Sequence, residues 1–274
     1  MVYFTDMKLL NGSELTGYIK ERQAHTVRDL RQGHGIAPKL AIIVTVDNPV
    51  IDVYVRLKQQ YGADILVDVD IHRVDITEIK DLLNKLGDDE TIHGIIVQLP
   101  LSDRAQTDAI VSLVKPEKDV DALGSQEVFE PATPMAIMWL LAGYNVDLTG
   151  KRVLLVGRGK LVGQPLEKSL LASEIDVHVA DRSTQDLEAE AKQADVIITA
   201  TGSPAIIYPH MIKRGAVVVD AGVASEDGKT VGDVAPEVYE RDDLTITPQK
   251  GGVGPLTVCA LFENVIRAAQ KKAS

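Results

Sequence analysis

The chain has 274 residues, 45% hydrophobic and 25% charged, which is typical of a folded enzyme with room for two domains. Its 29 basic and 40 acidic residues give a net charge of −11, so nucleic acid and anionic membranes are disfavoured as partners. The sequence lacks a signal-peptide pattern and any run of about 18 apolar residues, and we therefore expect a cytoplasmic protein. A single cysteine, Cys259, excludes an intramolecular disulfide.

The N-terminal half alternates predicted helices with apolar strands, as α/β proteins do. Its predicted elements are, in order, a helix over residues 13–30 capped by Ser13, a strand over 40–46, a helix opened by Asp47, Asn48 and Pro49, a strand over 65–72, a helix over 77–86, a strand over 93–101, a helix over 108–114, a loop over 115–121 and a helix over 133–142. Residues 143–150 are the expected linker to the second half.

The C-terminal half is organised around residues 151–165, which predict a buried strand, a glycine turn and a helix. Gly157, Arg158 and Gly159 let the backbone turn tightly and approach a ligand, and Gly163 lets the helix pack closely on the strand. The start of such a helix suits a pyrophosphate. The glycine spacing is one residue longer than in the usual dinucleotide motif, so a purely structural turn is the alternative.

The elements that follow favour dinucleotide binding over a structural turn. They are strands over residues 176–180, 195–200, 216–220 and 244–248 and a final helix over 256–269. Asp181 ends the first of these strands, close to the spacing of about 20 residues from the glycine turn at which an acid that binds the ribose is expected. The sequence therefore predicts a parallel, Rossmann-type domain in the second half.

Candidate catalytic residues follow the apolar strands, because ligands of α/β sheets bind beyond the carboxyl ends of the strands. Tyr54 and Lys58 are four residues apart on one predicted helix face, and Gln98 follows a later strand. A buried lysine can act as a base and a glutamine can orient it. On spacing alone, an ordinary amphipathic helix is the simpler interpretation. The six histidines show no paired metal-binding spacing, so we expect no metal site.

Six motifs, taken together and in this order, resemble one family, the bifunctional methylenetetrahydrofolate dehydrogenase/methenyltetrahydrofolate cyclohydrolases. They are YVRLK (54–58), GIIVQLPL (94–101), PEKDVDAL (116–123), PATP (131–134), VGRGKLVGQP (156–165) and KGGVGPLT (250–257). The resemblance implies a folate-binding catalytic α/β domain over residues 1–144, completed by a returning helix over 255–274, and a Rossmann NAD(P)-binding domain over 145–254. It also implies a folate site in the cleft between the domains and a homodimer.

The resemblance assigns roles by matching motif. Lys58 matches the catalytic lysine, Tyr54 the tyrosine that stacks on the pterin, Gln98 the partner of the lysine, and Asp121 the aspartate that holds the pterin. The remaining expected contacts are Leu99, Pro100 and Pro255 for the folate and Gly157, Arg158, Gly159, Gly163, Asp181, Arg182, Ser183 and Val223 for the dinucleotide.

Several positions depart from the family pattern. They are Ile51 for a serine, Ala122 for a glycine, Ala132 for a cysteine, Gly159 for a serine, Asp181 for a histidine and Lys250 for a proline. Two alternatives stay open at this point, another two-domain NAD(P)-dependent dehydrogenase and a non-enzymatic folate- or nucleotide-binding relative. Asp181 favours NAD, whereas Arg158 and Arg182 favour a 2′-phosphate, and we expect NADP rather than NAD.

Overall fold

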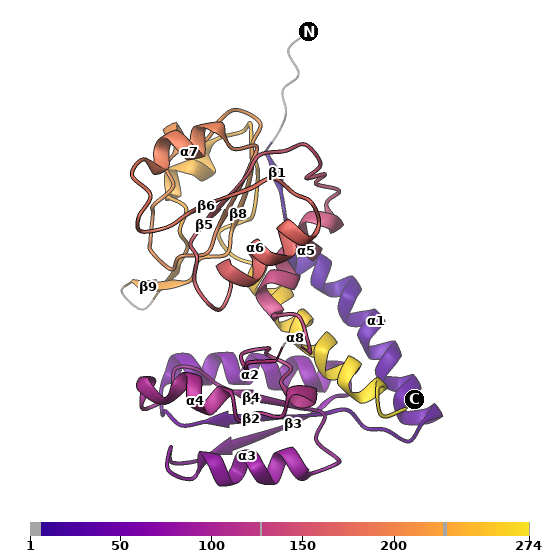
Figure 1. Cartoon of the computed structure of the whole chain (residues 1–274). Coiled ribbons are helices and arrows are strands. Elements are labelled where there is room, and N and C mark those ends of the chain that lie inside the picture. The colour runs from indigo at the N-terminus through magenta and orange to yellow at the C-terminus, as the bar shows by residue number, and fades with distance from the viewer. Residues whose placement is uncertain (1–6, 127, 227–228, 274) are drawn as a thin grey trace. The chain divides into compact units, whose positions relative to one another are not determined.

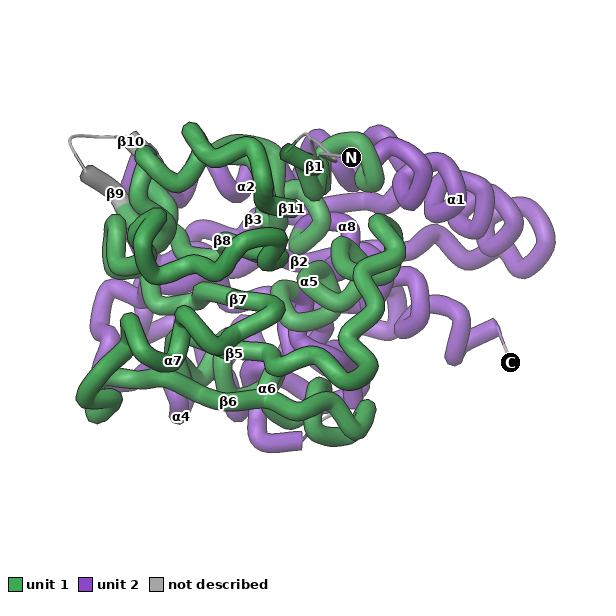
Figure 2. Tube along the Cα trace, turned by 90° about the horizontal axis from the view of Figure 1, so that it is seen from above, with its two compact units in different colours: residues 1–16, 133–257 green, residues 17–132, 258–274 purple. Residues whose placement is uncertain are grey.

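The structure is a computed structural model that describes residues 7–126, 128–226 and 229–273 (Figure 1). The chain forms two compact units, each built from two segments (Figure 2). Unit 1 comprises residues 1–16 and 133–257, and unit 2 comprises residues 17–132 and 258–274. Both are α/β units with parallel main sheets, as the sequence predicts.

Unit 2 is built on a three-stranded parallel sheet of order β3-β2-β4. Its strands and helices are β2 (Lys39–Val44), α2 (Pro49–Asp64), β3 (Asp68–Arg73), α3 (Ile79–Asp88), β4 (Gly94–Val97), α4 (Thr107–Val111), the short 3-10 helices η1 (Arg104–Gln106) and η2 (Pro116–Lys118), most of α1 (Gly12–Gly33) and the C-terminal part of α8 (Val253–Gln270). Side chains of β2 and β4 form a core with α3 and α4 on one face of the sheet. The sheet thereby positions α2, which follows β2, and the loop after β4.

Unit 1 contains a six-stranded parallel sheet of order β1-β11-β8-β7-β5-β6. Its elements are β1 (Lys8–Leu9), α5 (Ala132–Gly143), β5 (Val153–Val156), α6 (Gly163–Ala172), β6 (Val177–Ala180), α7 (Leu187–Gln193), β7 (Val196–Thr199), η3 (Pro209–Met211), β8 (Val217–Asp220), the hairpin β9 (Ala224–Glu226) and β10 (Lys229–Val231), η4 (Pro236–Glu240) and β11 (Thr245–Ile246). The chain forms β6 on one side of β5 and then β7 on the other, so the strand order reverses between β5 and β7, where a Rossmann-type sheet binds its ligand.

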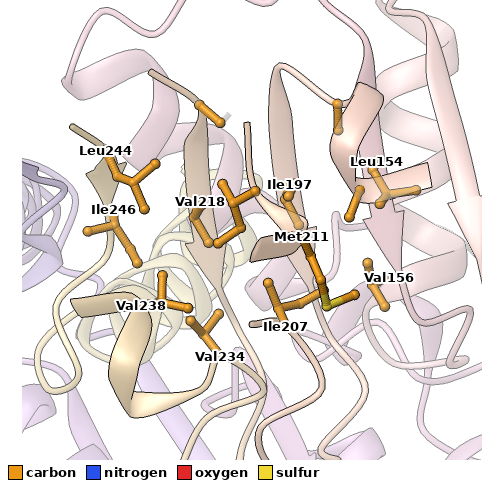
Figure 3. Packing of buried hydrophobic residues seen from close by; sticks show 14 of the residues in the cluster. Leu154, Val156, Ile197, Ile207, Met211, Val218, Val234, Val238, Leu244 and Ile246 are labelled. Atoms are coloured by element: carbon orange, nitrogen blue, oxygen red, sulfur yellow. The ribbon is translucent and has the colours of Figure 1, made fainter. Parts of the chain in front are cut away.

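One face of this sheet packs on a continuous apolar core. Figure 3 shows side chains of successive strands, among them Leu154, Ile197, Val218 and Ile246, directed to a common layer. The layer is completed by residues of α7, η3 and η4, such as Met211. Because strand side chains alternate between faces, the intervening residues of β5 and β7 point to the opposite face. Strands β5 and β7 are fully buried on both faces, which explains their uninterrupted apolar runs.

Two helix starts show how local sequence sets the elements. Asn48 caps α2 by accepting a hydrogen bond at 2.8 Å from the Val50 amide, and Pro49 is the first helical residue, as predicted. The cap predicted at Ser13 is wrong. The Asn11 side chain accepts from the Glu14 amide at 3.2 Å, and α1 begins one residue earlier, at Gly12.

The compact units differ in their boundaries from the expected domains. Residues 1–16 and 133–144 belong to unit 1, and residues 143–150 connect α5 to β5 inside it. The physical reason at the N-terminus is β1, which pairs with β11 at the edge of the sheet of unit 1. The Lys8 amide donates to the Leu244 carbonyl and the Leu10 amide to that of Ile246. Helices α1 and α8 contribute residues to both units.

Candidate active site

The predicted lysine and glutamine lie together in unit 2. Lys58 Nζ donates a hydrogen bond to Gln98 Oε1 at 2.7 Å, and Gln98 Nε2 donates to the Leu99 carbonyl at 3.1 Å. The second bond orients the amide so that its oxygen faces the amine. Burial lowers the pKa of Lys58, and the Asp121 carboxylate acts in the opposite direction. A neutral amine with a lowered pKa is the form that accepts a proton.

Asp121 is close enough to Lys58 for the two charges to act on each other. Burial raises the pKa of Asp121, whereas the Lys58 charge lowers it. The aspartate lies in the loop after η2, where Asp119 pairs with Ile95 through an isolated parallel bridge. The structure therefore brings together an amine, an amide and a carboxylate from α2, the end of β4 and this loop.

The other expected folate contacts are less closely joined. Tyr54 lies one turn before Lys58 on α2 and is 40% exposed, so its ring is available for stacking. Leu99 is partly buried against the core, and Pro100 is exposed after a cis peptide bond. Pro255 is the third residue of α8 and belongs to unit 1.

The three glycines in and after the turn that follows β5 differ in what a side chain at each position would contact. Gly157 has φ 108°, and a Cβ there would lie 2.6 Å from the Ala200 carbonyl oxygen. A Cβ at Gly163 would lie 2.1 Å from the Gly157 carbonyl oxygen, so this glycine permits the close packing of α6. A Cβ at Gly159 would meet no atom within 4 Å. The chain itself does not require Gly159 to be a glycine, and the open space suits a pyrophosphate that approaches the backbone.

The end of β6 carries the residues expected to distinguish the two dinucleotides. Asp181 accepts hydrogen bonds from the Ser183 amide at 2.8 Å and the Ser183 hydroxyl at 2.6 Å. These two hydrogen bonds lower the pKa of Asp181, and the charge of Arg158 lowers it further by a smaller amount. Arg158 donates two hydrogen bonds to Glu167 on α6, a partner that sequence reasoning missed.

Val223 follows β8 and is 58% exposed, at the end of a turn that is held by two carboxylates, the partly buried Asp220 and the buried Asp233. Asp220 accepts from the Gly222 and Val234 amides at 3.0 and 3.1 Å, and Asp233, which is fully buried, accepts from the Thr201 amide at 2.7 Å. Sequence reasoning also missed these positioning aspartates. The available signal was an acid at Asp233 inside the otherwise apolar run that follows Gly232.

Two further buried polar residues hold the loop that carries Asp121. The Lys118 ammonium is 5% exposed and donates to the Leu86, Gly87 and Asp89 carbonyls at the end of α3, at 2.7–3.0 Å. The Asp119 carboxylate accepts from the Gly124 amide at 2.8 Å. Adjacent charges such as these predict a solvated surface loop, which is why their burial was not foreseen.

The structure also places the departures from the family pattern. Ile51 is buried in α2, and Ala132 is buried at the start of α5. Ala122 has φ 54°, in the left-handed region that favours glycine. Within the described residues, no group of three or more histidine, cysteine, aspartate or glutamate side chains can hold a metal ion. No helix in the described part of the chain is long and apolar enough to cross a membrane.

A parallel sheet with a glycine turn at its switch point in one unit, together with a hydrogen-bonded lysine in a second α/β unit, defines an NAD(P)-binding enzyme of two α/β domains. Two family models match the chain. The tetrahydrofolate dehydrogenase/cyclohydrolase catalytic domain matches residues 10–121, and the NAD(P)-binding domain of the same family matches residues 131–273. The chain belongs to the tetrahydrofolate dehydrogenase/cyclohydrolase family.

Relatives match over nearly their full length. The bifunctional protein FolD of Acetivibrio thermocellus is 36% identical over 98% of this chain and 99% of its own. The crystal structure of FolD from Campylobacter jejuni has a TM-score of 0.91 and 35% identity, and covers 97% of this chain and 99% of its own. The Trypanosoma brucei enzyme, solved with NADP and an inhibitor, has a TM-score of 0.91 and 29% identity, and covers 97% and 98%. The resemblance seen in the motifs is confirmed.

Proposed function

We propose that this protein oxidises 5,10-methylenetetrahydrofolate to 5,10-methenyltetrahydrofolate with NADP and hydrolyses that product to 10-formyltetrahydrofolate, two consecutive steps of one-carbon metabolism. Membership of the family supports both activities. The observation that carries the assignment to this chain is the 2.7 Å hydrogen bond between Lys58 and Gln98, on two of the family's motifs.

The oxidation needs positioning and no protein acid or base. The methylene carbon lies between two amine nitrogens, and a nitrogen lone pair expels the hydride and leaves an amidinium-like cation. A bound dinucleotide supplies the hydride acceptor. The contribution of the chain is to hold the folate by stacking on Tyr54 and by Asp121, which is proximity work.

The hydrolysis needs a base, and Lys58 takes that role. Water attacks the methenyl carbon of the cation and gives one proton to the base. The bond from this carbon to N5 then breaks, the hydroxyl of the adduct loses its proton to become the carbonyl, and N5 takes up a proton, which leaves the formyl group on N10. Burial favours the neutral form of Lys58, and a substrate cation beside it acts in the same direction. Gln98 accepts a hydrogen bond from the Lys58 amine without adding a charge. This bond fixes the orientation of the amine nitrogen and of its lone pair.

The residues of unit 1 fit a dinucleotide, because Gly159 leaves open space beside the start of α6 and Asp181 ends the next strand. NADP is favoured over NAD by two guanidiniums, Arg158 and Arg182, near that strand end, and by the NADP complex of the trypanosomal relative. Asp181 opposes this choice, because its charge repels a 2′-phosphate.

The test is an assay of purified protein with methylenetetrahydrofolate and each dinucleotide, following methenyl absorbance. Turnover with a higher kcat/KM for NADP supports the proposal. Binding of both ligands without turnover would support a non-enzymatic relative, an alternative motivated by Ile51 and Ala122. We also propose a cytoplasmic homodimer. A monomer mass by sedimentation across micromolar concentrations would refute the dimer.

A further inference from the structure

The guanidinium of Arg158 is held by a carboxylate of the same unit. Arg158 Nε donates to Glu167 Oε2 at 2.9 Å and Arg158 Nη2 donates to Oε1 at 3.2 Å, which is a two-point contact. The Glu167 side chain is 18% exposed and that of Arg158 is 54% exposed. Glu167 is therefore fixed on α6, and it presents both oxygens to a more exposed arginine.

This ion pair lies at the edge of the sheet where the ribose of a dinucleotide is recognised. Strands β5 and β6 are paired, with Val156 opposite Ala180, and the Gly157 amide donates to the Ala180 carbonyl at 2.8 Å. The turn that carries Arg158 and the strand end that carries Asp181 are consequently neighbours. The charge of Arg158 reaches Asp181, where it contributes to lowering the pKa of that carboxyl.

Glu167 changes the charge balance of this edge. Arg158 and Arg182 provide two positive charges, and Asp181 and Glu167 provide two negative ones. Without Glu167, the other three side chains carry one net positive charge beside the position of a 2′-phosphate. With Glu167, the formal charges of the four side chains cancel, and a phosphate must displace Glu167 from Arg158 or share Arg158 with it.

We propose that Glu167 is a specificity-determining residue, which competes with the 2′-phosphate of NADP for Arg158 and so narrows the preference for NADP over NAD. This inference rests on the proposed dinucleotide-dependent function. NAD has a hydroxyl in place of that phosphate, which Asp181 can accept from while the Arg158–Glu167 pair stays intact. Removal of the Glu167 charge therefore strengthens binding only of ligands that carry the 2′-phosphate.

The test is isothermal titration calorimetry of the full chain with adenosine 2′,5′-bisphosphate and with ADP, which measures binding without turnover. Glu167→Gln keeps the side-chain shape and removes the charge. We expect it to tighten binding of the 2′,5′-bisphosphate by about threefold to fivefold, the upper part of the range of an exposed ion pair, and to change binding of ADP by less than about twofold. The matched control is Glu174→Gln, because Glu174 is exposed just beyond the other end of α6, about 10 Å away along the helix axis. This control removes the same charge and should leave both affinities within about twofold of wild type.

A double-mutant cycle tests whether Glu167 acts through Arg158. In an Arg158→Gln background, Glu167→Gln should no longer improve binding of the 2′,5′-bisphosphate. Equal tightening of both ligands, weaker binding of the bisphosphate, or an effect that persists without Arg158 would overturn the inference. If ADP binds but Glu167→Gln changes nothing, only this inference fails. If no variant binds either nucleotide, the proposed function fails with it.

Discussion

Replacing Lys58 by methionine separates the two proposed reactions. Only the hydrolysis uses the amine as a base, and a positioned general base typically contributes about 10²- to 10⁴-fold to a rate. We therefore expect Lys58→Met to lower the hydrolysis of methenyltetrahydrofolate by at least about 100-fold. The oxidation involves no proton transfer to the protein, so its rate should fall by less than about tenfold.

The same variant should still fold, which makes the kinetic result interpretable. Lys58 is partly buried, and methionine retains its apolar stem. Gln98 loses one donor, at a cost of about 1 kcal/mol, while the burial of an amine is relieved. We expect a free energy of unfolding within about 1 kcal/mol of wild type, measured by urea denaturation.

The assay follows the loss of methenyl absorbance for hydrolysis, and calorimetry with ADP confirms that the nucleotide site is intact. Lys80→Met is the control, because Lys80 is an exposed lysine on α3 in the same unit. It should leave hydrolysis unchanged. If Lys58→Met hydrolyses methenyltetrahydrofolate within about threefold of wild type, Lys58 is not the base and the assignment is wrong.

Three further predictions concern the tyrosine, the strained alanine and a buried histidine. Tyr54→Ala should raise the KM for folate more than that for the dinucleotide, since its role is stacking, and equal effects would indicate a folding defect. Ala122→Gly should stabilise the protein by about 0.5 kcal/mol in urea denaturation, because relief of the left-handed φ exceeds the added entropy of the unfolded chain, and clear destabilisation would contradict this. Burial lowers the pKa of His93 to about 4. The unfolded state therefore binds more protons between about pH 4 and 6.5, and wild type should lose about 2 kcal/mol more than His93→Gln between pH 7 and pH 5, a difference that should vanish if His93 is solvated.

The parallel sheets could be predicted because buried strands have a simple signature. Runs such as residues 40–44 and 153–156 are apolar without alternation, which is expected of strands covered on both faces. The start of α2 could also be predicted from the sequence, since Asn48 and Pro49 both favour a first helical turn. By contrast, β1 has two residues, Lys8 and Leu9, and both are exposed. Its place is set by backbone pairing with β11, which leaves no pattern in the side chains.

The candidate site could be predicted only in part from the sequence, for a related reason. Tyr54 and Lys58 share a helix face by their spacing alone, but Gln98 is 40 residues from Lys58 in the sequence. Their contact depends on β4 lying beside β2, with α2 following β2, and pair spacing does not determine that arrangement. The Arg158–Glu167 pair was missed because its members are nine residues apart and belong to a turn and a helix. Helical spacing rules cover only neighbours three or four residues apart.

The loop that carries Asp121 shows how a chain can keep an alanine where the family pattern has a glycine. A residue in a sparsely populated conformation persists only where its surroundings over-determine the backbone. Lys118 fixes the start of this loop to the end of α3, and Asp119 binds the Gly124 amide beyond the turn. From the other side, Asn264 on α8 donates to the Val120 carbonyl at 2.9 Å. The position of Asp121 is thus held by three buried polar side chains. Glycine at position 122 would relieve strain without being needed to place the carboxylate.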